Sequence, residues 1–336
     1  MSIKSVLVIR CGALGDLVYA TSVIDALKIE YGENVVIDFV STPSSGKLFE
    51  NDYRVNMVYP LKHKKIPIIF SKDKKNIINI SKNKPYDLLI NFESGKQFKS
   101  LLLAINASKK IGFFFNEINP PNDVVHMVEH TKFIFKDIVH EKVYENSYPK
   151  IIGKTKEECI KKYSLKNSYI VISPSNSHQK KNRLNYRAWV DFYWTELINR
   201  LSKEIQLVIV GGKNEEDFFQ KLQPYPPNII DLVGKTDISD LIGVIDGAVA
   251  LVATDTGTAH IASALNTEVF ALIGPTPANV TGPYKTPFNK VHIISANLKC
   301  SPCYKTQAMK NCTDNICMKQ IKPKIVLDEI LLANIL

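Results

Sequence analysis

Short apolar runs alternate with helix-like segments along most of this chain, and this alternation constrains the fold more than any other feature. The first half contains SVLVIR (5–10), followed by an expected helix near 16–30, then NVVIDFV (34–40) and YDLLINF (86–92). The second half contains SYIVISP (168–174), QLVIVGG (206–212), AVALVAT (248–254) and EVFALIG (268–274). Repeated strand, helix, strand units build parallel sheets covered by helices. The sequence therefore predicts an α/β protein with doubly wound sheets.

The chain is long enough for two domains. It has 336 residues, 45% of them hydrophobic, so it can bury two sizeable cores. Residues 146–168 contain NSYPK and a charged helical stretch, which is typical of a connector, and we place the boundary near residue 155. The last segment, 323–336, has the apolar spacing of a helix that can pack back on the first domain.

The chain is basic, with a net charge of +10. Such a field attracts phosphates, acidic glycolipids or nucleic acid. Most lysines stand among Asn and Ile, without the interleaved aromatic residues of a nucleic-acid stacking platform, so a solvated surface is favoured and no nucleic-acid partner is expected. Neither a membrane-spanning apolar run nor a signal peptide is present, and the prediction is a cytoplasmic protein.

The loop after the first predicted strand reads Arg10-Cys11-Gly12-Ala13-Leu14-Gly15-Asp16. In open α/β sheets, ligands bind outside the carboxyl ends of the strands, so this loop is a candidate site. Gly12 and Gly15 let the backbone turn tightly and let a substrate come close. Asp16 has two open interpretations, a helix cap and a functional carboxylate.

A second loop, Thr254-Asp255-Thr256-Gly257-Thr258-Ala259-His260, joins another strand to a helix of small residues. Free N–H groups at a helix N-terminus bind anions, and the hydroxyls of Thr256 and Thr258 add donors, so a pyrophosphate fits here without a metal. His260 lies one helical turn after Thr256 and is either a ligand contact or a buried core histidine. A rigid turn after the next strand brings Gly274 and Thr276 to the same edge of the sheet.

These motifs resemble those of glycosyltransferase family nine, the heptosyltransferases of lipopolysaccharide core assembly. The resemblance rests on VLVIRCGALGD at the N-terminus, D-T-G-x-x-H-x-A-x-A at 255–264 and F-A-x-x-G-P-T-x-P at 270–277. The C-terminal pattern C-S-P-C-x8-C-x4-C is also similar to that of the family. The motifs span both predicted domains in the right order.

The resemblance implies the GT-B fold, in which two Rossmann-like domains face a central crevice. Residues 1–155 would bind the acceptor and 156–322 the nucleotide sugar. The implied reaction is inverting transfer of a heptose from an ADP-heptose donor to a sugar hydroxyl of the anionic lipopolysaccharide inner core, at the cytoplasmic face of the inner membrane. The alternatives are a transferase or epimerase that uses another nucleotide sugar, and a non-catalytic module that binds a nucleotide sugar or nucleic acid.

Site residues follow from the same resemblance. Asp16 matches the catalytic base, and we expect Arg10, Gly12 and Gly15, in the same loop, to contact the acceptor. Asp255, Thr256, Gly257 and His260 match the family's donor-binding segment. From their places in the same loops, we also expect Thr254, Thr258, Gly274 and Thr276 to bind the donor. The family also has a phosphate-binding lysine in a K-x-W-P element. W-P is absent here; aligned on Trp189, we place the lysine position at Asn182, with Lys181 or Arg183 in its role.

Two further groups of residues remain open. Lys96 and Lys99 follow the strand at 86–92 and either hold the anionic acceptor or form a solvated surface. Cys300, Cys303, Cys312 and Cys317 have a spacing that can bind zinc, but the family pattern accounts for it without a metal. Because the chain also contains no D-x-D triplet, we expect neither a metal nor a cofactor.

Overall fold

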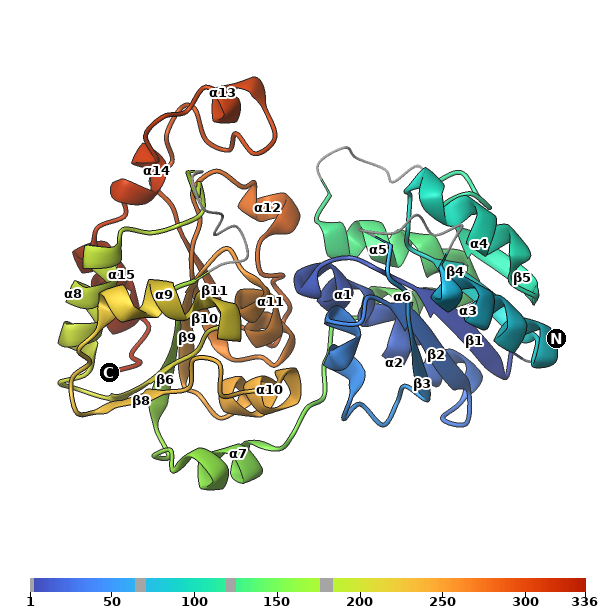
Figure 1. Ribbon diagram of the computed structural model, residues 1–336, viewed down its shortest axis with the longest axis horizontal. Helices are drawn as coiled ribbons and strands as arrows, with labels where there is room; N and C mark the ends of the chain where they lie inside the picture. Colours follow the sequence, from blue (N-terminus) through green and yellow to red (C-terminus); the bar gives the residue numbers. More distant parts are fainter. Residues whose placement is uncertain (1–2, 64–70, 119–124, 176–183) are drawn as a thin grey trace. The chain divides into compact units, whose positions relative to one another are not determined.

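A computed structural model describes residues 3–63, 71–118, 125–175 and 184–336 (Figure 1). The chain divides into two compact units, Met1–Ile152 and Gly153–Leu336. Each unit contains one parallel sheet. The α/β architecture with two doubly wound sheets confirms the fold class expected from the sequence. No helix in the described part of the chain is long and apolar enough to cross a membrane.

Within the described residues, the first unit has a five-stranded sheet in the order β3-β2-β1-β4-β5. Its strands are β1 (Ser5–Ile9), β2 (Val36–Ser41), β3 (Met57–Pro60), β4 (Tyr86–Asn91) and β5 (Ala107–Gly112). Its helices are α1 (Leu14–Ala20), α2 (Ser22–Tyr31), α3 (Lys72–Asn83), α4 (Lys99–Ala104), α5 (Met127–Phe135) and α6 (Glu141–Glu145), with short 3-10 turns η1 (Ser45–Phe49), η3 (Lys96–Phe98) and η4 (Lys136–Ile138). The core packs both faces of β1 and β4, which explains why those strands are largely apolar.

The helix expected near 16–30 is in fact two helices, α1 and α2, which meet at Thr21. The Thr21 hydroxyl donates to the Val18 carbonyl at 2.7 Å and accepts from the Lys150 backbone N–H at 3.1 Å. Ser22 donates in the same way to the Tyr19 carbonyl. These side chains compete with the backbone for carbonyl oxygens, which favours a break in the helix.

In the part of the second unit that the structure describes, a six-stranded sheet has the order β11-β10-β9-β6-β7-β8. Its strands are β6 (Tyr169–Ser173), β7 (Gln206–Ile209), β8 (Ile229–Asp231), β9 (Ala250–Thr254), β10 (Glu268–Leu272) and β11 (Val291–Ile294). The helices are α7 (Lys156–Tyr163), α8 (Asp191–Leu201), α9 (Glu216–Phe219), α10 (Ile238–Asp246), α11 (Gly257–Ala264), α12 (Ala278–Thr281), α13 (Gln307–Lys310), α14 (Ile316–Lys319) and α15 (Pro323–Leu332), with turns η5 (Lys213–Glu215) and η6 (Gln220–Leu222).

The core of the second unit is built around two tryptophans. Trp189 and Trp194 lie edge to face with ring centroids 4.7 Å apart, and the Trp189 indole N–H donates to the Ile321 carbonyl at 2.7 Å. Helix α15 packs on α8 in this unit through Val326 and Ile330, which belong to the same core (Figure 1). The expected contact of this C-terminal helix with the first domain stays a prediction.

Candidate active site

The strand order of the first unit identifies the edge where a ligand is expected. The chain runs from β1 through β2 to β3 on one side of the sheet, whereas β4 and β5 lie on the other side of β1. The strand order therefore reverses between β1 and β4, and ligands of doubly wound folds bind at the carboxyl ends of the strands beside such a reversal. The loop at residues 10–13 follows β1, and Phe92 and Glu93 follow β4.

Asp16 lies at the third position of α1, in its first turn. Its Oδ2 accepts the Ala13 backbone N–H at 2.9 Å, so it satisfies an N–H group at this helix terminus. The capping role expected of Asp16 is therefore confirmed, although Asp16 acts from the third position of the helix and Ala13 occupies the N-cap position itself. The Asp16 side chain is 39% exposed, which leaves its carboxylate open to a substrate.

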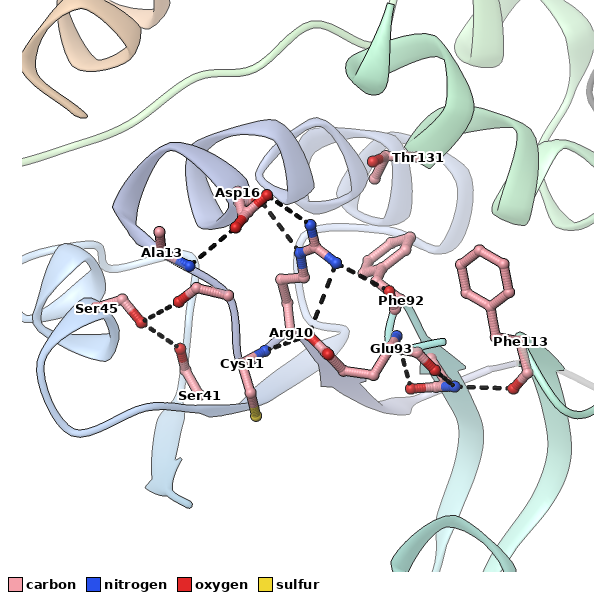
Figure 2. Close-up of polar contacts among 12 residues, drawn as sticks. Arg10, Cys11, Ala13, Asp16, Ser41, Ser45, Phe92, Glu93, Phe113 and Thr131 are labelled. Atoms are coloured by element: carbon pink, nitrogen blue, oxygen red, sulfur yellow. Dashed lines mark hydrogen bonds and ion pairs between the residues drawn. The ribbon is translucent and has the colours of Figure 1, made fainter. Parts of the chain in front are cut away.

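Arg10 connects this carboxylate to the loop after β4 (Figure 2). Its Nη2 donates to Asp16 Oδ1 at 2.9 Å, and its Nη1 donates to the Phe92 carbonyl at 3.0 Å. Glu93 Oε1 lies 3.7 Å from Arg10 Nη1 and accepts the Cys11 backbone N–H at 2.7 Å. The loops after β1 and β4 are thereby held together by one network of charged groups.

Gly12 packs directly against Asp16. A Cβ atom at residue 12 would stand 2.6 Å from Asp16 Oδ2 and 2.5 Å from its Cβ, so only glycine lets the loop approach the carboxylate. The Gly12 carbonyl accepts from the Ser45 hydroxyl at 3.2 Å, which ties the loop to η1 (Figure 2).

The other residues expected on the acceptor side differ in their exposure. Gly15 is buried in α1, whereas Lys96 and Lys99 are exposed.

Two titratable groups beside this network were not anticipated from the sequence. His130, on α5, has its pKa lowered by burial and by the positive charge of Arg10. Burial, with a smaller contribution from the Glu93 carboxylate, raises the pKa of the Cys11 thiol well above its ordinary value. The thiol is therefore neutral near pH 7 and is not a nucleophile there.

The second unit repeats this arrangement at its own reversal point. Strands β6 and β9 are neighbours, and β7 and β10 lie on their outer sides. Strand β9 ends at Thr254, Thr256 is the cap position of α11, and the Thr258 hydroxyl donates to the hydroxyl of Ser173, the last residue of β6, at 2.8 Å. His260 is buried in the first turns of α11. The N–H groups of this helix terminus thus lie where a ligand of a doubly wound unit is expected.

Asp255 is the centre of a buried polar group. Its Oδ2 accepts from the Thr276 hydroxyl at 2.6 Å and lies 3.2 Å from Arg187 Nε. The Arg187 guanidinium also lies over the Tyr304 ring, 4.9 Å from its centroid. Because the Asp255 side chain is only 6% exposed, its carboxylate fixes the shape of the loop and connects it to the turn after β10.

Arg187 is a residue that the sequence reasoning missed. In a K-x-W-P element the lysine stands two residues before the tryptophan, and the residue two before Trp189 is Arg187. The alignment of the lysine position to Asn182 is therefore wrong. Lys181 and Arg183, expected in the phosphate-binding role, lie outside the described residues.

The turn after β10 packs against the cysteine-rich segment. A Cβ atom at Gly274 would stand 2.6 Å from the Met318 sulfur and 2.8 Å from the Cys317 sulfur. The backbone N–H groups of Cys303 and Tyr304 both donate to the Pro275 carbonyl. This segment holds Tyr304 against Arg187 and so supports the loop at Asp255. Among the described residues, no group of three or more His, Cys, Asp or Glu side chains is arranged to hold a metal ion.

Each of the two doubly wound units thus has a polar site at its own reversal of strand order. The first unit offers an open carboxylate there, and the second offers a helix N-terminus with threonine hydroxyls. Two Rossmann-like units with sites of this kind are typical of the GT-B class of glycosyltransferases. The sequence model of glycosyltransferase family 9 (heptosyltransferase) matches residues 82–313. The chain belongs to this family.

Relatives of known name agree with that assignment. The chain is 23% identical over 286 residues to lipopolysaccharide heptosyltransferase 3 of Escherichia coli, covering 78% of this chain and 81% of that protein. It is 32% identical over 127 residues to lipopolysaccharide heptosyltransferase 1 of Pseudomonas aeruginosa, covering 37% of this chain and 34% of that protein.

Among solved structures, the glycosyl transferase family 9 protein of Veillonella parvula superposes with a TM-score of 0.79 at 15% identity, covering 99% of this chain and 98% of that one. ADP-heptose lps heptosyltransferase II of E. coli superposes with a TM-score of 0.76 at 19% identity, covering 98% of this chain and 99% of that one. E. coli heptosyltransferase WaaC with ADP superposes with a TM-score of 0.72 at 17% identity, covering 98% of this chain and 99% of that one. At these identities the likeness shows the fold.

Proposed function

We propose that this glycosyltransferase moves a heptose from ADP-heptose to a sugar hydroxyl of the lipopolysaccharide inner core, with inversion at the anomeric carbon. The family is that of the heptosyltransferases, and two relatives are named for action on lipopolysaccharide. A solved structure of similar fold is described with ADP bound. The net charge of +10 suits an anionic acceptor at the cytoplasmic face of the inner membrane.

Asp16 is the general base of the proposed reaction, and its open carboxylate at the reversal of strand order is the observation on which the proposal depends. The acceptor hydroxyl gives its proton to this carboxylate as its oxygen attacks the anomeric carbon. The bond between that carbon and the pyrophosphate oxygen breaks, and its electron pair leaves with ADP. A single displacement of this kind inverts the anomeric configuration.

The proposed donor site is the loop at residues 254–260 with Gly274 and Thr276. The N-terminus of α11 and the hydroxyl of Thr256 offer hydrogen-bond donors to the pyrophosphate, while Thr258 ties the start of this helix to Ser173 at the end of β6. Arg187 supplies a positive charge at the base of the same loop, through its ion pair with Asp255. Such a site stabilises the leaving diphosphate without a divalent cation.

The proposed acceptor site surrounds Asp16. Gly12 leaves room beside the Asp16 carboxylate for the sugar, the buried Gly15 belongs to the helix that carries Asp16, and Lys96 and Lys99 add positive charge after β4. The two lysines are exposed and can pair with phosphate or carboxylate groups of a core sugar.

The test is a panel of nucleotide sugars incubated with a truncated core acceptor, with the product weighed by mass spectrometry. We expect the acceptor to gain the mass of one heptose when ADP-heptose is supplied, with one ADP released for each product. Transfer from a UDP-sugar together with no product from ADP-heptose would contradict the proposed donor.

A further inference from the structure

The two oxygens of the Asp16 carboxylate have different surroundings. Oδ1 accepts a charge-assisted hydrogen bond from Arg10 at 2.9 Å. Oδ2 accepts only the neutral backbone N–H of Ala13, also at 2.9 Å, among the contacts of the described residues. A hydrogen bond from a guanidinium is about twice as strong as one from a neutral donor, so a proton is held less readily on Oδ1 than on Oδ2.

Gly12 lies on the side of Oδ2. A side chain at this position would begin 2.6 Å from Oδ2, whereas glycine places no side-chain atom there, and the Asp16 side chain as a whole is 39% exposed. Oδ2 has a second lone pair besides the one that accepts from Ala13. Oδ1 keeps a second lone pair as well, but it already accepts from the Arg10 guanidinium, so Oδ2 is the oxygen that holds a hydroxyl proton more readily.

Arg10 is itself fixed by the loop after β4. Its Nη1 donates to the Phe92 carbonyl at 3.0 Å and lies 3.7 Å from Glu93, and its side chain is only 15% exposed. Glu93 is fixed in turn, because its Oε1 accepts from Cys11 and its backbone N–H donates to Asn91 Oδ1. The guanidinium cannot turn towards a substrate without losing these partners.

We propose that Arg10 is a positioning residue: it holds Oδ1 of Asp16 so that Oδ2 is the oxygen that takes the proton of the acceptor hydroxyl. The inference rests on the proposed role of Asp16 as base. The proton moves from the acceptor oxygen to Oδ2, the acceptor oxygen bonds to the anomeric carbon, and the diphosphate leaves with the electron pair. Arg10 acts through Asp16 and does not contact the sugar, unlike the acceptor contact expected from the sequence.

A double-mutant cycle of Arg10→Gln and Asp16→Asn tests the proposal, with kcat and the donor and acceptor KM values measured for all four proteins. Arg10→Gln should lower kcat about tenfold with both KM values within about twofold, because orientation of the base is lost but binding is not. In the Asp16→Asn protein, the same change should alter kcat less than about twofold. Arg10→Lys, which keeps one charged donor, should recover part of the loss.

Arg54 offers a matched control in the same unit. It also pairs with two carboxylates, those of Asp25 and Asp52, but it lies outside the loops that form the proposed site. Arg54→Lys should change kcat by the same small factor in the parent and in the Asp16→Asn protein. Gly12→Ala provides an independent measurement, and it should lower kcat about tenfold or more by covering Oδ2.

The outcomes distinguish failure of the positioning role from failure of the proposed function. If Asp16→Asn alone turns over within a few-fold of the parent, Asp16 is not the base of the reaction. The positioning role of Arg10 is then refuted as well. If Asp16→Asn loses about a hundredfold in kcat but Arg10→Gln costs the same factor in both backgrounds, or raises the acceptor KM instead of lowering kcat, Arg10 is not a positioning residue and the proposed base stands.

Discussion

Replacing Arg187 by methionine should destabilise the second unit and weaken donor binding. Methionine keeps much of the apolar bulk of the arginine stem but leaves the Asp255 carboxylate, 6% exposed, without its cation. Breaking a buried ion pair in this way ordinarily costs about 3–5 kcal/mol. The Thr276 hydroxyl still donates to Asp255, and Arg187 is 17% exposed, so we expect a loss of about 2–3 kcal/mol. For a unit of this size, that lowers the melting temperature by about 5–10 °C.

The assay is thermal unfolding followed by calorimetric binding of ADP at a temperature where each variant is folded. ADP affinity should fall about tenfold, because the loop that offers its N–H groups to the pyrophosphate loses its support. Combining Arg187→Met with Asp255→Asn should cost less stability than the sum of the two single changes, since the carboxylate that needs the cation is then gone.

Arg200 is the matched control for this experiment. It pairs with Glu196 one turn earlier on α8 at 2.9 Å, but its side chain is 50% exposed, and such surface pairs contribute at most about 0.5 kcal/mol. Arg200→Met should therefore leave both the melting temperature and ADP affinity almost unchanged. If Arg187→Met behaves like Arg200→Met, the buried pair with Asp255 supports neither the unit nor the donor site.

Three further predictions concern the metal, the donor loop and acid stability. A chelator should leave most activity intact, and loss of activity restored by magnesium or manganese would contradict the metal-free donor site. His260→Ala should raise the donor KM more than the acceptor KM, and an equal rise in both would remove His260 from the donor site. Burial raises the pKa of Asp240, but hydrogen bonds from Lys154, Lys162 and Tyr163 outweigh it and lower the pKa from 3.8 to about 2. Asp240 therefore stabilises the folded state above about pH 4, and this contribution should disappear as the pH falls towards about 2. Asp240→Asn should flatten acid unfolding curves over that range, and an unchanged curve would contradict the assignment.

The sequence predicts the central strands of both sheets but none of the edge strands. β3, β5, β8 and β11 were all missed, and each lies at the edge of its sheet. A central parallel strand is covered on both faces and is apolar almost throughout, as in SVLVI of β1. An edge strand has one side open, so polar residues interrupt it, as in ASKKIG of β5. Only the pairing of the edge strand with its neighbour reveals it.

The site shows the same division between local and long-range information. Asp16 and the loop at 254–260 stand in motifs whose glycines and threonines are visible in the sequence. The connections of Arg10 with Glu93 and of Thr258 with Ser173 join residues that are far apart along the chain. They follow only from the order of the strands, which places β1 beside β4 and β6 beside β9. The role of Arg187, by contrast, could have been predicted from the sequence, because Arg187 stands two residues before Trp189, as the lysine does in K-x-W-P.

The most direct test of the proposed mechanism is the turnover of Asp16→Asn. Asparagine keeps the shape of the side chain and an oxygen that can accept the Ala13 N–H, but it cannot take a proton from the acceptor. We predict that kcat falls about a hundredfold or more, while donor affinity and the melting temperature change little. If the variant turns over within a few-fold of the parent, Asp16 only supports the start of α1 and the base of the reaction is another group.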